Sequence, residues 1–248
     1  MLPPEAFMHE DIKHCHKCAL SLSRKHLIPG EGNLSARHFL IAQAPGKMED
    51  EMARMFVGPS GEVFWRLLLD AEADIQDVYM TNLLKCRLPK NRRPKQAEVQ
   101  ACSEYLLQEL NEVKPGIVCP LGYYSTKFIF EYFKLGVFSK MEYPSLLGKA
   151  FVHSRFIVIP LSHPSSLIHH PEYYTNAKER YYRAFHLQQC KWFEQCPIRG
   201  YTLMRKISFY FTDSFCLGDW TKCERYKLES AGIEHPDSLL PDGRTINL

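Results

Sequence analysis

Apolar residues form four short, nearly continuous runs along the chain, each rich in β-branched or aromatic residues. The runs are HFLIAQ (38–43), DVYMTNLL (77–84), GIVCPLG (116–122) and RFIVIPLS (155–162). Strands of a parallel sheet that is covered on both faces show this pattern, whereas half-exposed strands alternate apolar with polar residues. The pattern therefore predicts four buried, parallel strands.

Segments with helical periodicity lie between these runs. They cover residues 60–74, where Ser60 is placed to cap the helix, and residues 95–113 and 123–133. This alternation predicts an α/β fold, a three-layer α/β/α domain around a central four-stranded parallel sheet. Ligand sites of such sheets lie at the carboxyl ends of strands. Here APG (44–46) follows the first run, Asn82 lies near the end of the second, and His163 follows the fourth.

The chain changes character near residue 188. The remainder carries four cysteines, many aromatic residues and one short helical pattern near 221–231. We therefore expect a main domain at 1–188 and a small cysteine-containing C-terminal module at 189–248. Extra constraint such as a metal is plausible for so small a unit. Its Cys196, Cys216 and Cys223 either bind zinc or pack as small hydrophobic side chains.

The composition suits one substantial core with a smaller appendage, at 248 residues and 45% hydrophobic. No apolar run resembles an export signal or reaches the roughly 18–20 residues of a membrane span. Nine cysteines without an export signal indicate a reducing compartment, where clustered cysteines are more often metal ligands than disulfides. We expect a cytoplasmic monomer with no membrane partner.

Positive charge is concentrated in one segment, although the net charge is only +3. Six basic residues lie close together there: Lys85, Arg87, Lys90, Arg92, Arg93 and Lys95. Such a run is either a solvated surface or a surface that binds phosphates, and charge alone does not separate the two.

Two cysteine pairs indicate a metal. Cys15 and Cys18 form a Cys-x2-Cys pair, and fifteen residues separate Cys86 from Cys102. Thiolates select zinc or iron–sulfur clusters, and four cysteines are a common ligand set for either. Spacing alone leaves both open.

Three further segments resemble the motifs of family 4 uracil-DNA glycosylases. AQAPGKMEDEMARMFVGPSG (42–61) is similar to the first family motif, VYMTNLLKCRLPKNRRP (78–94) to the second, and HPSSLIHHP (163–171) to the third. The cysteine pairs fall where that family holds a four-iron four-sulfur cluster. The resemblance covers roughly residues 10–185. It implies a monofunctional enzyme that flips uracil out of single- or double-stranded DNA and hydrolyses the glycosidic bond.

The resemblance also assigns roles to individual residues. Phe56 would stack on the flipped base, and the Asn82 amide would bond both O4 and N3–H of uracil, which cytosine does not match. His163 would donate a hydrogen bond to O2 as negative charge develops there. Further expected positions are Ala42, Ala44, Gly46 and Ser165 for the base, Arg87, Arg92, Ser166 and Leu167 for DNA, and Cys15, Cys18, Cys86 and Cys102 for the 4Fe–4S cluster.

The sequence departs from the family at its usual Gly-Glu, which is Ala42-Gln43 here. Gln43 can hold a water or uracil O2 through its amide but cannot take a proton. Glu49 and Asp50 match the family's acidic stretch, and one of them, with Glu49 as the residue we name, is expected to orient or activate water. Two alternatives to the enzyme remain. One is a catalytically weak or inactive iron–sulfur protein that binds DNA damage, and the other is a zinc-stabilised binding module without a base pocket.

Overall fold

Three buried, parallel strands form the centre of the larger unit in this computed structural model, which describes residue 12 and residues 14–246. β2 (His38–Ala42) lies between β3 (Val78–Asn82) and β4 (Ile117–Pro120) and pairs in parallel with both. Every residue of the three strands is buried, as the continuous apolar runs predicted.

The fourth predicted strand is interrupted. Its first part, β6 (Ile157–Val158), forms an antiparallel hairpin with β5 (Phe151–Val152). The N–H groups of Ile159 and Leu161 then donate to carbonyls of β4 at 2.9 and 3.0 Å. Pro160 between them has no N–H to donate, so regular pairing on both sides cannot continue.

A short edge strand completes this sheet on the other side, where β1 (Glu31–Gly32) runs antiparallel to β3. The α/β class is therefore confirmed. The detail of four regular, all-parallel strands is inexact, because the sheet contains antiparallel pairs and the fourth run is split.

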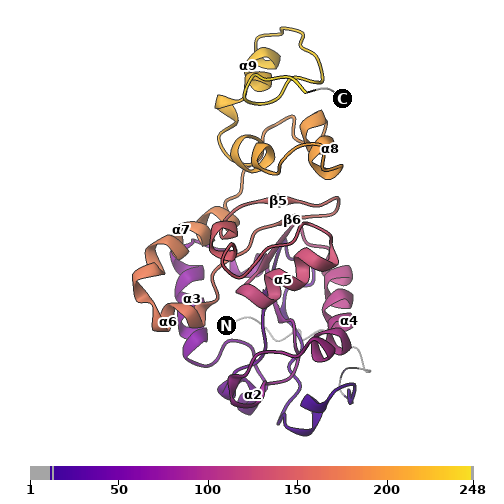
Figure 1. Cartoon of the computed structure of the whole chain (residues 1–248). Helices are drawn as coiled ribbons and strands as arrows, with labels where there is room; N and C mark the ends of the chain where they lie inside the picture. Colours follow the sequence, from indigo (N-terminus) through magenta and orange to yellow (C-terminus); the bar gives the residue numbers. More distant parts are fainter. Residues whose placement is uncertain (1–11, 13, 247–248) are drawn as a thin grey trace. The chain divides into compact units, whose positions relative to one another are not determined.

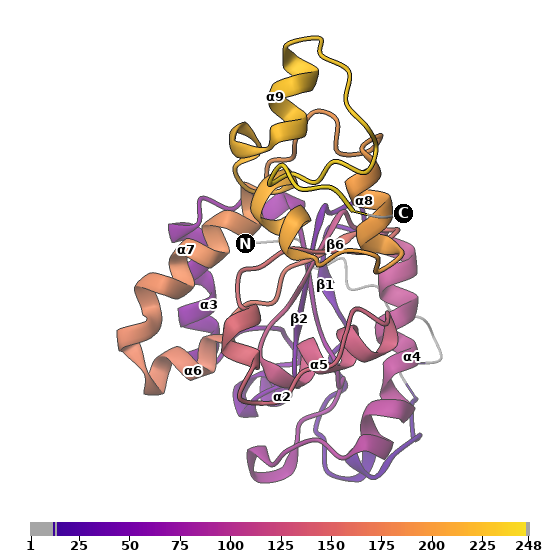
Figure 2. The ribbon, with the colours of Figure 1, turned by 45° about the horizontal axis from the view of Figure 1, so that its top comes forward.

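Helices cover both faces of the sheet, which gives the three predicted layers (Figures 1 and 2). One layer contains α3 (Pro59–Asp70), α6 (Pro164–His169) and α7 (Tyr174–Phe185), and the other contains α4 (Gln96–Val113) and α5 (Tyr123–Tyr132). The short α2 (Lys47–Met52) follows β2. Single 3-10 turns are η1 (Ala19–Leu22), η2 (Ile75–Asp77), η3 (Pro89–Asn91), η4 (Tyr143–Leu146) and η5 (Pro171–Tyr173).

The predicted cap of α3 was wrong. Gly58 occupies the N-cap position and Pro59 the first helical position, so Ser60 lies inside the first turn. Proline suits that first position because its φ is already helical and its missing N–H would have no partner there.

The described chain divides into two compact units. The first comprises the described residues up to Gly148 together with Ile159–Phe185, and the second comprises Lys149–Val158 together with the described residues from His186 onward. The second unit contains β5, β6, α8 (Pro197–Leu203), the π-helical turn η6 (Thr212–Cys216), η7 (Trp220–Lys222) and α9 (Glu224–Ser230). Within it, the N–H of Ala150 donates to the Asp213 carboxylate at 2.7 Å, which ties the hairpin to η6. No helix of the described residues has the length and apolarity that crossing a membrane requires.

Candidate active site

A cavity of about 880 Å³ is lined by the segments that follow the parallel strands at their carboxyl ends. Gln43 and Gly46 follow β2, Gly122 and Tyr123 follow β4, and His163 follows the Ile159–Leu161 segment. Its volume lies in the range of small-molecule pockets. The site therefore forms where the sheet topology predicts it.

His163 is held as a neutral hydrogen-bond donor. It precedes α6, and its Nδ1 accepts the backbone N–H of Ser165 at 3.1 Å. A backbone N–H can only donate, so Nδ1 carries the lone pair and the ring proton is on Nε2. Burial lowers the pKa of His163 to about 4. Near neutral pH the ring is therefore uncharged and carries an Nε2–H that makes no hydrogen bond within the described chain.

Most of the residues predicted for the loops that follow the first and fourth apolar runs lie together in this cavity. Its lining includes Gln43, Ala44, Gly46, His163, Ser165, Ser166 and Leu167. The lining also includes residues that the motifs did not single out, among them Tyr123, Tyr143 and Arg180. Gly122 ends the third predicted strand and Tyr123 directly follows it, so the rule that sites lie at strand ends was a signal for them.

Phe56 lies outside this lining and is almost fully covered, with 6% of its surface exposed. Its ring stacks on Phe64 with centroids 3.8 Å apart. Its backbone has a φ of 51°, a left-handed conformation that costs energy for a bulky residue. The indole N–H of Trp65 donates to the Phe56 carbonyl at 3.0 Å and helps to hold this conformation.

Asn82, the last residue of β3, is also outside the lining and only 2% exposed. Its Nδ2 donates to the sulfur of Met55 at 2.9 Å. Ala42 faces it in the sheet register and is buried too. The Asn82 amide is thus fixed at the carboxyl end of β3, where its N–H group donates to a sulfur, a weak acceptor.

Glu49 fixes the backbone that follows Phe56. Its Oε1 accepts the N–H groups of Val57 and Gly58 at 3.1 and 2.8 Å. Its Oε2 makes no hydrogen bond within the described residues and faces Gly46, where an added Cβ would collide with it. One oxygen of this buried carboxylate therefore organises the Phe56 segment, and the other faces the cavity-lining loop.

A buried ion pair that local sequence patterns did not predict supports the end of β3. Lys85 belongs to the basic run but is fully buried, with its ammonium 2.6 Å from the Glu109 carboxylate of α4. The same ammonium donates to the Asn82 carbonyl at 3.0 Å and also to the Thr81 hydroxyl. Lys85 is therefore not part of a solvated basic surface, because its charge is neutralised inside the fold.

The two predicted DNA-binding arginines have different surroundings. Arg92 forms two hydrogen bonds to Glu98, the first at 2.8 Å, and Glu98 also accepts the N–H of Lys95 at 2.9 Å. The pairing with Arg92 lowers the pKa of Glu98. Arg87 is half-buried, and its Nε has no partner among the described residues. Lys90 and Arg93 are exposed.

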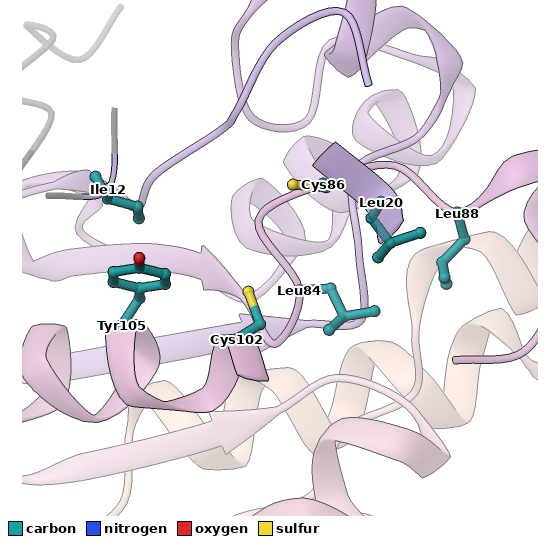
Figure 3. Close-up of a cluster of buried hydrophobic side chains, with 7 residues drawn as sticks. All are labelled: Ile12, Leu20, Leu84, Cys86, Leu88, Cys102 and Tyr105. Carbon is teal, nitrogen blue, oxygen red and sulfur yellow. The ribbon is translucent and has the colours of Figure 1, made fainter. Parts of the chain in front are cut away.

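The four cysteines of the two N-terminal pairs converge. Cys86, on the connection after β3, and Cys102, on α4, belong to one buried apolar cluster (Figure 3), and Cys15 and Cys18 pack against it. The Cys86 sulfur accepts a guanidinium N–H of Arg24 at 3.2 Å, and the Cys102 sulfur accepts the N–H of Lys85 at 3.3 Å.

These surroundings fit a soft-metal group, because N–H donors to the sulfurs stabilise thiolates and tune clusters. Burial raises the pKa of both Cys86 and Cys102, so binding a metal there would have to release their protons. Within the described residues, no group of three or more His, Cys, Asp or Glu side chains is arranged to hold a metal ion. What the structure provides is four thiols around one apolar cluster.

Comparisons with known proteins agree with the fold. The family model described as the uracil DNA glycosylase superfamily matches residues 29–186. A type-4 uracil-DNA glycosylase of Saccharolobus solfataricus is 35% identical over 65% of this chain and 76% of its own length. One of Thermotoga maritima is 35% identical over 64% and 80%, and one of Pyrobaculum aerophilum is 41% identical over 50% and 63%.

These matches place the chain in one class of proteins, the uracil-DNA glycosylases, which remove uracil from DNA. The chain belongs to the uracil-DNA glycosylase superfamily and, within it, to the type-4 family. The family model ends at residue 186, so the tail lies outside what the superfamily shares.

Proposed function

We propose that this chain excises uracil from DNA by stabilising the departing base rather than by activating water strongly. The observation that carries the proposal is the neutral His163 in the cavity, with Nδ1 occupied by Ser165 and an Nε2–H left to donate. Cleavage of the glycosidic bond moves negative charge onto uracil O2. A fixed, neutral donor stabilises that charge without first having to lose a proton.

Base recognition is assigned to Phe56 and Asn82. A flipped uracil would stack on an aromatic face, worth about 1–3 kcal/mol per base, and the Asn82 amide would read O4 and N3–H. Asn82 bonds to Met55 sulfur in this structure, so reading a base requires that weak contact to be exchanged for a bond to O4. The rigid backbone around Phe56, held by Trp65 and Glu49, supports such a fixed reading geometry.

Water is oriented by Gln43 and Glu49 in this proposal. Gln43 lines the cavity and offers an amide, and Oε2 of Glu49 faces the adjoining loop at Gly46. Because Gln43 cannot accept a proton, the chain lacks the strong base of its relatives' motif. General acid–base catalysis typically contributes about 10²–10⁴-fold, so we expect slower rather than absent excision.

A four-iron four-sulfur cluster is assigned to Cys15, Cys18, Cys86 and Cys102, which pack around one apolar cluster. Its contribution would be structural, since hydrolysis moves no electrons. These four residues would tie the N-terminal segment to the loop that carries Arg87 and Arg92. That loop, with Ser166 and Leu167 at the cavity, would contact the DNA backbone and the space left by the flipped base.

The substrate is uracil in single- or double-stranded DNA, handled by a monomer. The test is single-turnover cleavage of a uracil-containing oligonucleotide, read as nicking after alkali. We expect His163→Ala to slow excision by about 10²–10³-fold and Asn82→Ala to remove the preference for uracil over cytosine. His153→Ala, which does not line the cavity, is the matched control. A wild-type chain that binds uracil-DNA without cleaving it would establish the damage-binding alternative instead.

A further inference from the structure

The second unit contains a cavity of its own, lined by four cysteines that the proposed excision does not use. Cys190, Cys196, Cys216 and Cys223 all line this space of about 190 Å³. The rest of its wall is mostly aromatic, with Trp192, Phe193, Phe215, Trp220 and Tyr226. Four cysteines from two segments, 190–196 and 216–223, therefore line one largely apolar hollow.

The segments that carry these cysteines are fixed to one another. The N–H of Cys190 donates to the Cys216 carbonyl at 2.8 Å. Cys196 directly precedes α8 and Cys223 directly precedes α9. Burial raises the pKa of both Cys190 and Cys223, and the backbone N–H groups of Trp192 near Cys190 and of Tyr226 and Arg225 near Cys223 act in the opposite direction. Donors of this kind around sulfur are typical of thiolate ligands.

A buried arginine supplies an independent observation. Arg225 lines the same cavity and is only 5% exposed. One terminal nitrogen donates to the carbonyls of Pro236, Asp237 and Leu239 at 2.9–3.1 Å, and its Nε is buried with no partner in the described chain. Its nearest carboxylate, Asp237, is 3.7 Å away and mostly exposed. A buried guanidinium in the lining of the same cavity would compensate the negative charge of thiolate ligands, because a buried charge is costly without a counter-charge.

The N-terminal set shows the same combination of four thiols and one arginine. There Arg24 donates to the Cys86 sulfur at 3.2 Å. The two sets lie in different units and share no residue. The C-terminal set therefore has the same chemical components as the first, built from unrelated sequence.

We propose that Cys190, Cys196, Cys216 and Cys223 bind a second iron–sulfur cluster, which holds the C-terminal unit together. Cavity size favours a cluster over zinc, because four sulfurs at about 2.3 Å from one zinc ion leave no hollow of this volume. Ligand spacing does not separate the two, because five and six residues lie between the cysteines of each pair, more than in typical zinc pairs or in the common iron–sulfur motifs.

The test is metal analysis of the full chain, purified without oxygen, for iron, acid-labile sulfide and zinc. We expect Cys196→Ala/Cys223→Ala to lose about half of the iron and sulfide, and Cys15→Ala/Cys18→Ala to retain about half. Cys119→Ala, which removes a buried thiol of β4 outside both sets, should retain all of it. Cys15→Ala/Cys18→Ala keeps the C-terminal cysteines intact, so its iron content tests the proposal even if Cys196→Ala/Cys223→Ala fails to fold.

The outcomes separate this proposal from the N-terminal cluster. Iron that survives in Cys15→Ala/Cys18→Ala, and disappears when Cys196 and Cys223 are replaced as well, supports the second cluster. If the C-terminal variant keeps all of its iron, or if the site contains zinc instead, the proposal is overturned. If the wild-type chain holds the C-terminal cluster but no N-terminal one, Cys15→Ala/Cys18→Ala loses no iron and Cys196→Ala/Cys223→Ala loses all of it.

Discussion

Ser165 donates its backbone N–H to Nδ1 of His163 at 3.1 Å, and its hydroxyl lies 2.7 Å from the same nitrogen. This relationship fixes the tautomer of the histidine, because both groups present a hydrogen to Nδ1. The loop that follows the fourth predicted run thus places the ring proton of His163 on Nε2, the nitrogen left to donate in the cavity.

The pH dependence of excision follows from this arrangement. Burial lowers the pKa of His163 to about 4, so the ring stays neutral from pH 8 down to about pH 5. We expect single-turnover excision to show no loss attributable to His163 over that range and to fall as the pH approaches 4. The measurement is a rate profile from pH 8 to 4.5. A drop centred near pH 6.5, the ordinary histidine value, would show that the ring titrates freely.

The same shift affects folding in a defined direction. The unfolded chain protonates His163 near pH 6.5, whereas the folded chain resists protonation until about pH 4. Between these values the unfolded state binds more protons, so stability falls as the pH is lowered through this window. His163→Gln should weaken this decline. Urea unfolding of both proteins at pH 7 and pH 5 measures the difference, and an unchanged decline would contradict the assignment.

Gly122 provides a test of how closely His163 must be positioned. Its φ is 88°, and a Cβ added there would lie 3.0 Å from the Cβ of His163. We expect Gly122→Ala to displace the imidazole and slow excision by up to about 10²-fold. Gly136→Ala is the matched control, because Gly136 also has a positive φ, of 146°, but no atom within 4 Å of the added Cβ. Equal losses in both variants would mean that backbone strain alone is responsible.

Gln43 is the position where this chain departs from its relatives' motif, and it lines the cavity. Gln43→Glu restores a group that can accept a proton at nearly the same volume. We expect faster single-turnover uracil excision, within the roughly 10²–10⁴-fold that general acid–base catalysis supplies. Gln76→Glu, outside the cavity, controls for added charge. An unchanged rate in Gln43→Glu would refute the role given to this position.

The sequence predicted those features that hydrophobic periodicity and motif spacing encode. Continuous apolar runs gave the central strands, and helical periodicity gave α4 and α5 almost to the residue. The loop containing His163 followed from its position after an apolar run. Pro160 explains why the last run was read as one strand, because its apolar side chain continues the pattern while its missing N–H interrupts the pairing.

Contacts between distant residues were not predictable in this way. Lys85 looked like one more charge in a basic run, and only the fold brings it to Glu109, 24 positions away. The contact between Asn82 and Met55 spans 27 positions and likewise has no local signature. Local pattern identifies which elements form, whereas the partner of a buried polar group depends on how those elements pack.

The Lys85–Glu109 pair leads to a prediction about stability. Lys85→Met leaves the Glu109 carboxylate buried without its counter-charge, and breaking a buried pair in this way typically costs about 3–5 kcal/mol. We expect the free energy of unfolding, measured in urea, to fall by that amount. Excision should weaken as well, because Lys85 also donates to the carbonyl of Asn82.

The double variant Lys85→Met/Glu109→Gln tests the cause of that loss. The two oxygens of Glu109 accept separately from the N–H of Gly30 and the hydroxyl of Thr81. An uncharged glutamine keeps an oxygen for the N–H of Gly30, and its amide N–H can donate to the hydroxyl oxygen of Thr81, which no longer receives the Lys85 ammonium. Most of the lost stability should therefore return. Lys127→Met, in an exposed pair with Glu131 at 3.7 Å, should change stability by less than about 0.5 kcal/mol. If the double variant is as unstable as Lys85→Met alone, the loss comes from packing of the lysine side chain rather than from an uncompensated charge.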